Sequence, residues 1–184
     1  MEEKNKAWKT VSSKYLFRRP WLTVRCEDML LPNGNHIPEY YILEYPDWVN
    51  TIAITKEGKF VFVRQYRPGI GRTCYELCAG VCEKEDASPL VSAQRELWEE
   101  TGYGNGNWQE YMLISANPST HTNLTYCFLA IDVELIDHQH LEATEDLSVH
   151  LLTLEEVKRL LDNNEIMQAL NACLLYTSDA ADDL

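Results

Sequence analysis

The sequence predicts an α/β sandwich preceded by a small all-β unit. Residues 15–45 alternate apolar and polar side chains, as half-buried strands do, whereas two well-separated later segments carry helix signals. At 184 residues, the chain is long enough for one ordinary domain with a full core and a small appendage.

The expected strands share alternating or continuous apolar positions between turn residues: 21–31, 39–45, 51–67, 73–77, 111–117 and 123–135. The first two flank the turn sequence PNGN at 32–35. Segment 51–67 is expected to be a hairpin that turns at Glu57 and Gly58. These strands would build the N-terminal unit first and the sheet of the sandwich afterwards.

The first predicted helix covers residues 89–101, PLVSAQRELWEET. Ser88 is a suitable N-cap, and Pro89 at the first helical position lacks an N–H that the helix would leave unbonded in any case. Gly102 is a typical residue just past a helix C-terminus. The segment therefore has both of its ends marked.

The second predicted helix covers residues 154–162. Thr153 and Glu156, three residues apart, match a capping box, and apolar residues at helical spacing follow.

Composition restricts the function classes. A formal net charge of −13 argues against general nucleic-acid binding, because no basic surface is available for phosphates. It leaves open a phosphate substrate held through a divalent metal ion. No apolar run approaches the length of a membrane span, and the N-terminal MEEKNKAWK lacks the apolar core of a signal peptide. We therefore expect a cytoplasmic protein without a membrane partner.

Two further segments need separate treatment. Cys74, Cys78 and Cys82 recur every fourth residue, but zinc sites usually add a second, distant pair, so reduced thiols are the preferred interpretation. The tail comprises residues 173–184, CLLYTSDAADDL, and its first ten residues resemble a translated reading frame of a common sequencing adapter. We expect this tail to be non-native and the natural chain to be cut near Ala172; the alternative is a natural polar tail.

Three carboxylates gather near the end of the first predicted helix. Glu96, Glu99 and Glu100 share one helix face, and Arg95 lies four residues before Glu99, where it can pair with it. Such clustered oxygen ligands suit Mg²⁺ or Mn²⁺, which bridge to substrate phosphates. A solvated acidic face is the simpler interpretation of these residues when they are taken alone.

The context of this helix favours a site. Residues 80–103, GVCEKEDASPLVSAQRELWEETGY, resemble the signature of the Nudix hydrolases, whose core is R-E-U-x-E-E-x-G-U with U an apolar residue. The stretch from Gly80 to Arg95 is one residue longer than the family pattern. The early glutamate of that pattern would therefore be replaced by Glu85 or Asp86.

The preceding segment FVRQYRPGIGRTCYELCAG resembles the ADP-ribose pyrophosphatase branch of that family. The resemblance implies an α/β/α sandwich with a mixed sheet (47–172) behind an N-terminal β domain (1–46). It also implies homodimers that exchange the N-terminal domain between subunits, and hydrolysis of a nucleoside diphosphate linked to another moiety. The first candidate reaction converts ADP-ribose to AMP and ribose 5-phosphate.

The resemblance also assigns roles to residues. The principal metal ligands would be Glu96, Glu100 and the Ala79 carbonyl, with Mg²⁺ or Mn²⁺ as cofactor. Glu99 would be a third ligand or a catalytic support. Arg95 would orient the carboxylates. Glu145, on the loop before the second helix, would be the general base, with Glu142 as the alternative.

Substrate contacts are implied at Arg67, Glu76, Pro118, Trp21 and Tyr40. The two aromatic residues would stack on the base, although each is equally suited to pack on its own sheet. Segment 117–123, NPSTHTN, departs from the glycine-rich form common among ADP-ribose enzymes, and its His121 is a further possible substrate contact. Two alternatives therefore stay open. The substrate is another nucleotide sugar or a dinucleotide, or the protein is a non-catalytic sensor of ADP-ribose-like ligands.

Overall fold

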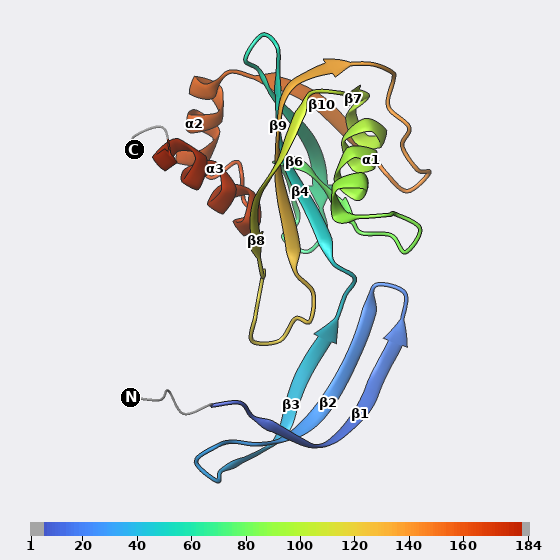
Figure 1. Cartoon of the computed structure of the whole chain (residues 1–184), viewed down its shortest axis with the longest axis vertical. Coiled ribbons are helices and arrows are strands. Elements are labelled where there is room, and N and C mark those ends of the chain that lie inside the picture. Colours follow the sequence, from blue (N-terminus) through green and yellow to red (C-terminus); the bar gives the residue numbers. More distant parts are fainter. Residues whose placement is uncertain (1–5, 182–184) are drawn as a thin grey trace. The chain divides into compact units, whose positions relative to one another are not determined.

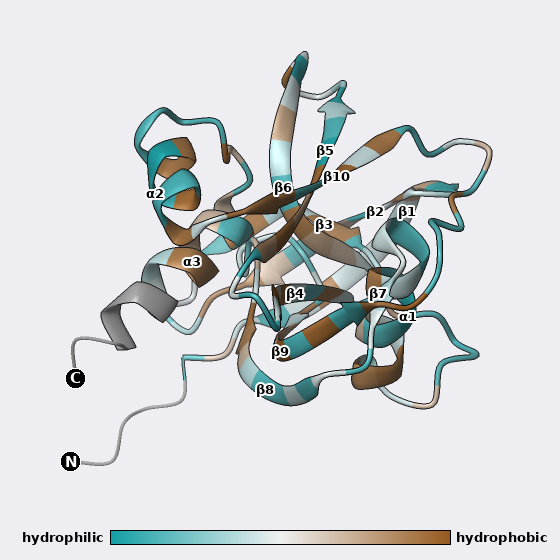
Figure 2. Cartoon of the chain, turned by 90° about the horizontal axis from the view of Figure 1, so that it is seen from above, coloured by the Kyte–Doolittle hydropathy of each residue, from teal (hydrophilic) through white to brown (hydrophobic). Residues whose placement is uncertain are grey.

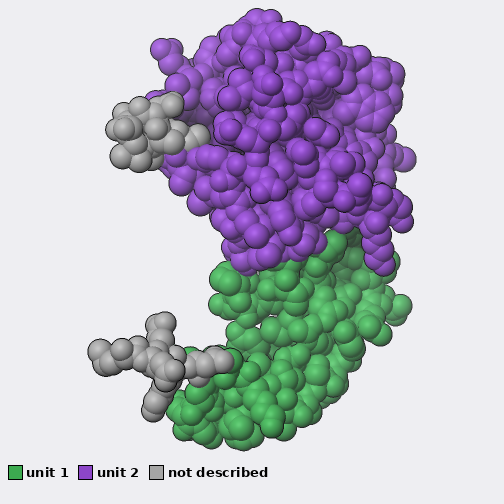
Figure 3. All heavy atoms as spheres, in the orientation of Figure 1, with its two compact units in different colours: residues 1–46, 117–123 green, residues 47–116, 124–184 purple. Residues whose placement is uncertain are grey.

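The computed structural model describes residues 6–181 and falls into two compact units (Figure 3). The N-terminal unit comprises the chain up to Pro46 together with residues 117–123, and the second unit comprises 47–116 and the chain from Leu124 onward. Within the described range, no helix has the length and apolarity that crossing a lipid bilayer requires.

The described part of the N-terminal unit is an antiparallel three-stranded sheet in the order β1-β2-β3. Its strands are β1 (Lys9–Arg19), β2 (Leu22–Leu30) and β3 (His36–Glu44). β1 is not among the predicted strands, because all of its residues are exposed and its sequence lacks a regular apolar and polar alternation. The 117–123 loop joins this sheet through backbone bonds from Leu43 N to Thr120 O (2.8 Å) and from Thr122 N to Leu43 O (3.1 Å).

The second unit contains a seven-stranded sheet among its described residues, ordered β10-β5-β6-β4-β9-β7 with β8 paired to β9. Its strands are β4 (Trp48–Thr55), β5 (Phe60–Arg67), β6 (Arg72–Val81), β7 (Tyr103–Gly104), β8 (Asn107–Ile114), β9 (Thr125–Leu135) and β10 (Leu147–Leu152). β4 and β9 run parallel, whereas the other described pairs run antiparallel. The sheet is therefore mixed, as expected.

The predicted hairpin over 51–67 is correct at its turn and wrong in its pairing. Gly58 N donates to Thr55 O (2.9 Å), and Gly58 has a φ of 73°, which suits glycine. β4 and β5 then meet only at Ile54 and Phe60. β6 pairs with both of them, along β5 through residues 72–77 and along β4 through residues 78–81. Long β6 thus separates the two strands, because it supplies backbone partners to each in turn.

The helices of the described range are α1 (Pro89–Thr101), α2 (Leu154–Asp162) and α3 (Ala169–Ala181). α1 and α2 have the predicted bounds and caps, including the capping box of Thr153 and Glu156. α3 was not among the predicted helices; it extends to Ala181 and buries Leu174 and Leu175. Whether the tail sequence is native stays a prediction.

The helices cover both faces of the second unit's sheet. Figures 1 and 2 show α1 on one side and α2 with α3 on the other. On the α1 side, Leu97 packs in a cluster with Ala53, Val61 and Val63. The other cluster joins α2 and α3 to the opposite face of the same strands, through Ile52, Phe62, Leu77, Val157 and Leu174. Alternate residues of these strands thus pack into two cores, one on each face of the sheet. This arrangement is an α/β/α sandwich.

Candidate metal and diphosphate site

Helix α1 presents the clustered carboxylates toward the sheet. Ser88 Oγ accepts a hydrogen bond from Val91 N (3.3 Å), and Gly102, with a φ of 75°, donates to Trp98 O (2.8 Å). Ala93 and Leu97 are fully buried and fix the rotation of the helix about its axis. Because Glu100 lies three residues after Leu97, this rotation buries its carboxylate as well.

Arg95 is the cation within this cluster. Its Nη1 donates to Glu99 Oε2 (2.8 Å) and Glu96 Oε1 (3.1 Å), and its Nη2 donates to Asp86 Oδ2 (3.1 Å). A further bond runs from Nη2 to Val81 O (3.0 Å). The bonds from Arg95 also hold the pKa of Asp86 below its usual value. Asp86, and not the exposed Glu85, therefore occupies the early acidic position of the 80–103 motif.

Glu100 is the most deeply placed carboxylate of the three, with 5% of its surface exposed. Burial raises its pKa to about 8, against hydrogen bonds from the Cys78 thiol and the Ala79 backbone. Its Oε2 has no hydrogen-bond partner among residues 6–181. Burial also raises the pKa of Glu96. Both groups are thus ionised only at a cost, which a nearby cation would offset.

Gly80 makes room for this arrangement. A Cβ atom at this position would lie 2.0–2.3 Å from the carboxyl atoms of Glu96, so the Glu96 carboxylate would have to move away. The backbone N–H of the next residue, Val81, donates to Glu96 Oε1 (3.2 Å). The glycine of the motif therefore lets the Glu96 carboxylate lie directly against β6.

These residues fit a divalent cation that prefers oxygen ligands. The donors available are the carboxylates of Glu96, Glu99 and Glu100 and the carbonyl of Ala79, all hard oxygens. The unpartnered Oε2 of Glu100 and the raised pKa values are what a set of carboxylates shows before a cation neutralises it. The predicted ligands are thus brought together by α1 and β6.

A cavity of about 510 Å³ adjoins this cluster, since Ala79 and Gly80 line it. Arg67 and Glu76 also line it, and Arg67 Nε donates to Glu76 Oε1 (2.8 Å) while Nη2 bonds the other oxygen. Glu76 is only 3% exposed, so its carboxylate is placed to orient the half-buried guanidinium. A fixed guanidinium suits a phosphate group.

Sequence reasoning missed two polar residues of this cavity, Asn50 and Thr125. Asn50 Nδ2 donates to Asn171 Oδ1 (2.7 Å), while Asn50 Oδ1 and Thr125 Oγ1 are buried without a partner in the described part of the chain. Both side chains belong to strands, β4 and β9, that are otherwise largely apolar. A polar residue inside such a strand was the available signal.

Glu145 and Glu142 lie on the exposed loop between β9 and β10. Glu145 Oε2 accepts a hydrogen bond from Glu142 N (2.8 Å). The negative charge of Glu145 is among the causes that raise the pKa of Glu100. The loop therefore brings Glu145 within electrostatic range of the metal-ligand candidates.

The remaining predicted substrate contacts belong to the N-terminal unit. Trp21 is 75% exposed and has a φ of 62° in the turn between β1 and β2. The Tyr40 hydroxyl donates to Ser119 O, and its ring meets Trp8 edge to face at 5.5 Å. Pro118 is exposed on the 117–123 loop. Tyr40 is thus engaged within its own unit, whereas Trp21 is accessible.

Comparison with known proteins identifies the family. Residues 45–171 match the NUDIX domain, which contains the cavity-lining strands and the whole of α1. The chain belongs to the Nudix family. Residues 8–43 match the nucleoside diphosphate sugar hydrolase N-terminal domain. The expected Nudix pyrophosphatase class is thereby confirmed, and Nudix hydrolases generally use divalent metal ions.

Two relatives cover nearly the whole Nudix chain. ADP-ribose pyrophosphatase of Bacillus subtilis (strain 168) is 31% identical over 165 residues, which is 89% of this chain and 88% of the relative. Methanol dehydrogenase activator of Bacillus methanolicus is 30% identical over 166 residues, covering 86% and 89%. These similarities confirm the expected branch of the family.

A solved structure, that of an ADP compounds hydrolase, has a similar fold. It superimposes with a TM-score of 0.84 and 20% identity over 97% of this chain and 95% of that chain.

Proposed function

We propose that this Nudix hydrolase cleaves the diphosphate bond of a nucleoside diphosphate linked to another moiety, with ADP-ribose as the first candidate substrate. The observation that supports this proposal best is the buried carboxylate cluster of α1 beside a cavity that holds an oriented arginine, Arg67. A diphosphate needs both charge neutralisation and positioning, and these two features supply them.

The residues would divide the work as follows. Glu96, Glu99, Glu100 and the Ala79 carbonyl would hold Mg²⁺ or Mn²⁺, which neutralises phosphate charge when bound. Arg95 keeps the carboxylates in place. Arg67, oriented by Glu76, would donate to a phosphate oxygen.

The remaining step is attack by water on one phosphorus atom. Glu145 would accept a proton from the attacking water as the bond from that phosphorus to the bridging oxygen breaks. With ADP-ribose and one water, the products are AMP and ribose 5-phosphate. The electrostatic effect of Glu145 on Glu100 favours it over Glu142 as the base.

ADP-ribose is placed first because the Bacillus subtilis relative carries that substrate in its name. Trp21 would stack on the adenine, Tyr40 would support the same region, and Pro118 would contact substrate from the 117–123 loop. Another nucleotide sugar or a dinucleotide would keep the same chemistry. The predicted homodimer and cytoplasmic location rest on the sequence and stay predictions.

The experiment is a substrate panel with Mg²⁺ in excess: ADP-ribose, GDP-mannose, NADH and diadenosine polyphosphates. Nucleoside monophosphate release is followed by chromatography, with Glu100→Gln as the inactive control. We expect the wild-type protein to release AMP from ADP-ribose and the Glu100→Gln variant to release none. Binding of ADP-ribose without turnover, with either Mg²⁺ or Mn²⁺, would instead favour the sensor alternative and overturn the enzymatic proposal.

A further inference from the structure

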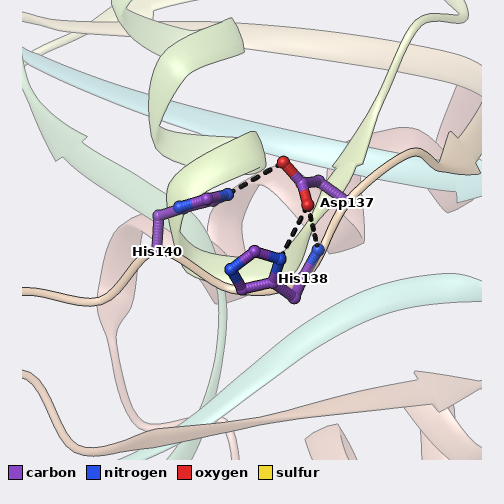
Figure 4. A group of neighbouring side chains, drawn as sticks. All are labelled: Asp137, His138 and His140. Carbon is purple, nitrogen blue, oxygen red and sulfur yellow. Dashed lines mark hydrogen bonds and ion pairs between the residues drawn. The ribbon is translucent and has the colours of Figure 1, made fainter.

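The loop that follows β9 gathers two histidines around one aspartate (Figure 4). His138 Nδ1 lies 2.7 Å from Asp137 Oδ1, and His140 Nε2 lies 2.9 Å from Asp137 Oδ2. The two imidazole rings are 4.3 Å apart at their centroids. One ligand atom from each of the three residues lies within 4.8 Å of the others, so a single ion can be reached by all three.

The backbone of this loop is held in place by the C-terminal end of α1. Asp137 N donates to Gly102 O (3.1 Å), and His140 N donates to Glu99 O (2.8 Å). The His140 ring stacks on Trp98 with a centroid distance of 4.2 Å and an interplanar angle of 28°. The cluster therefore stands on a fixed backbone, so an ion would have little chain left to order.

The donor set differs in kind from the carboxylates of α1. Imidazole nitrogen suits Zn²⁺, Cu²⁺ and Ni²⁺, whereas Mg²⁺ prefers oxygen ligands. Exposed side-chain fractions of 79% for His138, 39% for Asp137 and 32% for His140 leave room for water as a remaining ligand. The alternative is that the two rings only hydrogen-bond to the Asp137 carboxylate. That alternative explains the contacts but predicts that the loop takes up no metal ion.

We propose that Asp137, His138 and His140 form a second metal site, which binds a divalent transition metal ion such as Zn²⁺. The site lies on the loop that follows β9, beside the C-terminal end of α1. It is independent of the carboxylate site in its ligands and goes beyond the proposed hydrolysis.

The test is a calorimetric titration of the full chain with Zn²⁺ while Mg²⁺ is kept in large excess. Mg²⁺ competes for the oxygen ligands of α1 and poorly for imidazole. We expect one Zn²⁺ per chain, and the same uptake by Glu100→Gln. Uptake that Glu100→Gln abolishes would overturn the proposal, since the ion would then belong to α1.

Two variants test the histidine ligands, and a third serves as the control. His138→Gln removes an exposed nitrogen, and His140→Phe removes a nitrogen while keeping a ring to stack on Trp98. Each should weaken Zn²⁺ binding by at least about tenfold, the lower end of what loss of an outer-shell partner costs a metal site. His36→Gln is the matched control, because His36 makes an exposed pair with Asp28 (3.2 Å) elsewhere in the chain.

His138→Gln decides the matter, because its exposed ring makes the smallest contribution to folding, and a melting curve verifies that the variant is folded. Zn²⁺ affinity that is unchanged by His138→Gln, or lowered equally by His36→Gln, would overturn the site. Nitrogen hyperfine structure from two imidazoles in the spectrum of bound Cu²⁺, reduced to that of one imidazole in each loop variant, is the expected spectroscopic signature.

Discussion

At the scale of single residues, the acidic side chains of the Nudix site are not all neutralised by a basic partner. Arg95 contacts Asp86, Glu96 and Glu99, but no contact between Arg95 and Glu100 is formed. Glu100 is instead buried beside Cys78 and keeps one oxygen without a partner in the described range. The metal-free chain therefore stores an electrostatic cost at this residue, which a bound cation would relieve.

The first prediction concerns Glu100 and pH. In the folded, metal-free chain its pKa is about 8, against 4.5 ordinarily, so between these values the folded state holds a proton that the unfolded chain has lost. The free energy of unfolding should therefore fall as pH rises through this window. Glu100→Gln should flatten the curve and be the more stable protein near pH 8. Urea unfolding with a chelator measures this.

The same experiment has a metal arm. Mg²⁺ should raise the midpoint of wild type near pH 8 and leave Glu100→Gln nearly unchanged, because a ligand stabilises only the state that binds it. Parallel pH curves for the two proteins would show that the pKa of Glu100 is not raised, and equal stabilisation by Mg²⁺ would show that Glu100 is not a ligand.

The second prediction concerns the base. Removing a general base typically lowers the rate by about 10²- to 10⁴-fold. Glu145→Gln should lower the turnover number by this order under saturating Mg²⁺, with substrate affinity nearly kept. Glu142→Gln is the comparison, since the two residues share the loop and a hydrogen bond. A larger loss in Glu142→Gln would transfer the assignment to Glu142.

At the scale of elements, α1 is fixed at both ends. Ser88 caps its first turn. The 136–140 loop donates hydrogen bonds to carbonyl oxygens of its last turn, including one from Gln139 Nε2 to Glu100 O (2.7 Å). A helix that carries metal ligands must not shift along its axis, because a small displacement of a catalytic group lowers the reaction rate strongly. The caps therefore contribute to the site as well as to stability.

The third prediction tests the N-terminal cap. Ser88→Ala should lower the free energy of unfolding by about 1 kcal/mol, because Val91 N loses its acceptor. Ser88→Asp, which keeps an acceptor at the same position, should stay close to wild type. Chemical denaturation of both variants decides this, and an equal loss in the two would mean that the hydroxyl does not act as a cap.

At the scale of the whole molecule, the N-terminal sheet leaves much apolar surface exposed. Its large exposed side chains are Trp8, Val11, Tyr15, Leu16, Phe17, Trp21, Leu22 and Tyr41. A three-stranded sheet with one uncovered apolar set is marginal by itself, and such a patch usually marks an interface. This supports the homodimer that the Nudix branch implies.

The fourth prediction is therefore a dimer in solution at micromolar concentration, measured by light scattering. Phe17→Glu, at an exposed apolar position of β1, should shift the mass toward that of a monomer, because it would bury a charge at the interface. A monomeric wild type, or a mass unchanged by both Phe17→Glu and Leu16→Glu, would contradict the dimer.

The local features of this chain were determined by its sequence. Both ends of α1 and the start of α2 follow from short-range chemistry: a hydroxyl at Ser88 or Thr153, a glycine at 102, and apolar residues at helical spacing. The shared face of Glu96, Glu99 and Glu100 also follows from helix geometry alone. The R-E-U-x-E-E-x-G-U core was enough to indicate the family that residues 45–171 then matched.

Tertiary structure decided what depends on distant partners. The sequence near Gly58 predicts a turn, but β6 takes most of the pairing of both flanking strands, because strand partners are chosen by the packing of the whole sheet. β1 and α3 were missed because neither has a regular apolar periodicity of its own. Likewise, only the fold could choose Asp86 over Glu85 for Arg95 and join Asp137, His138 and His140 to the end of α1, since such contacts arise when separate elements meet in space.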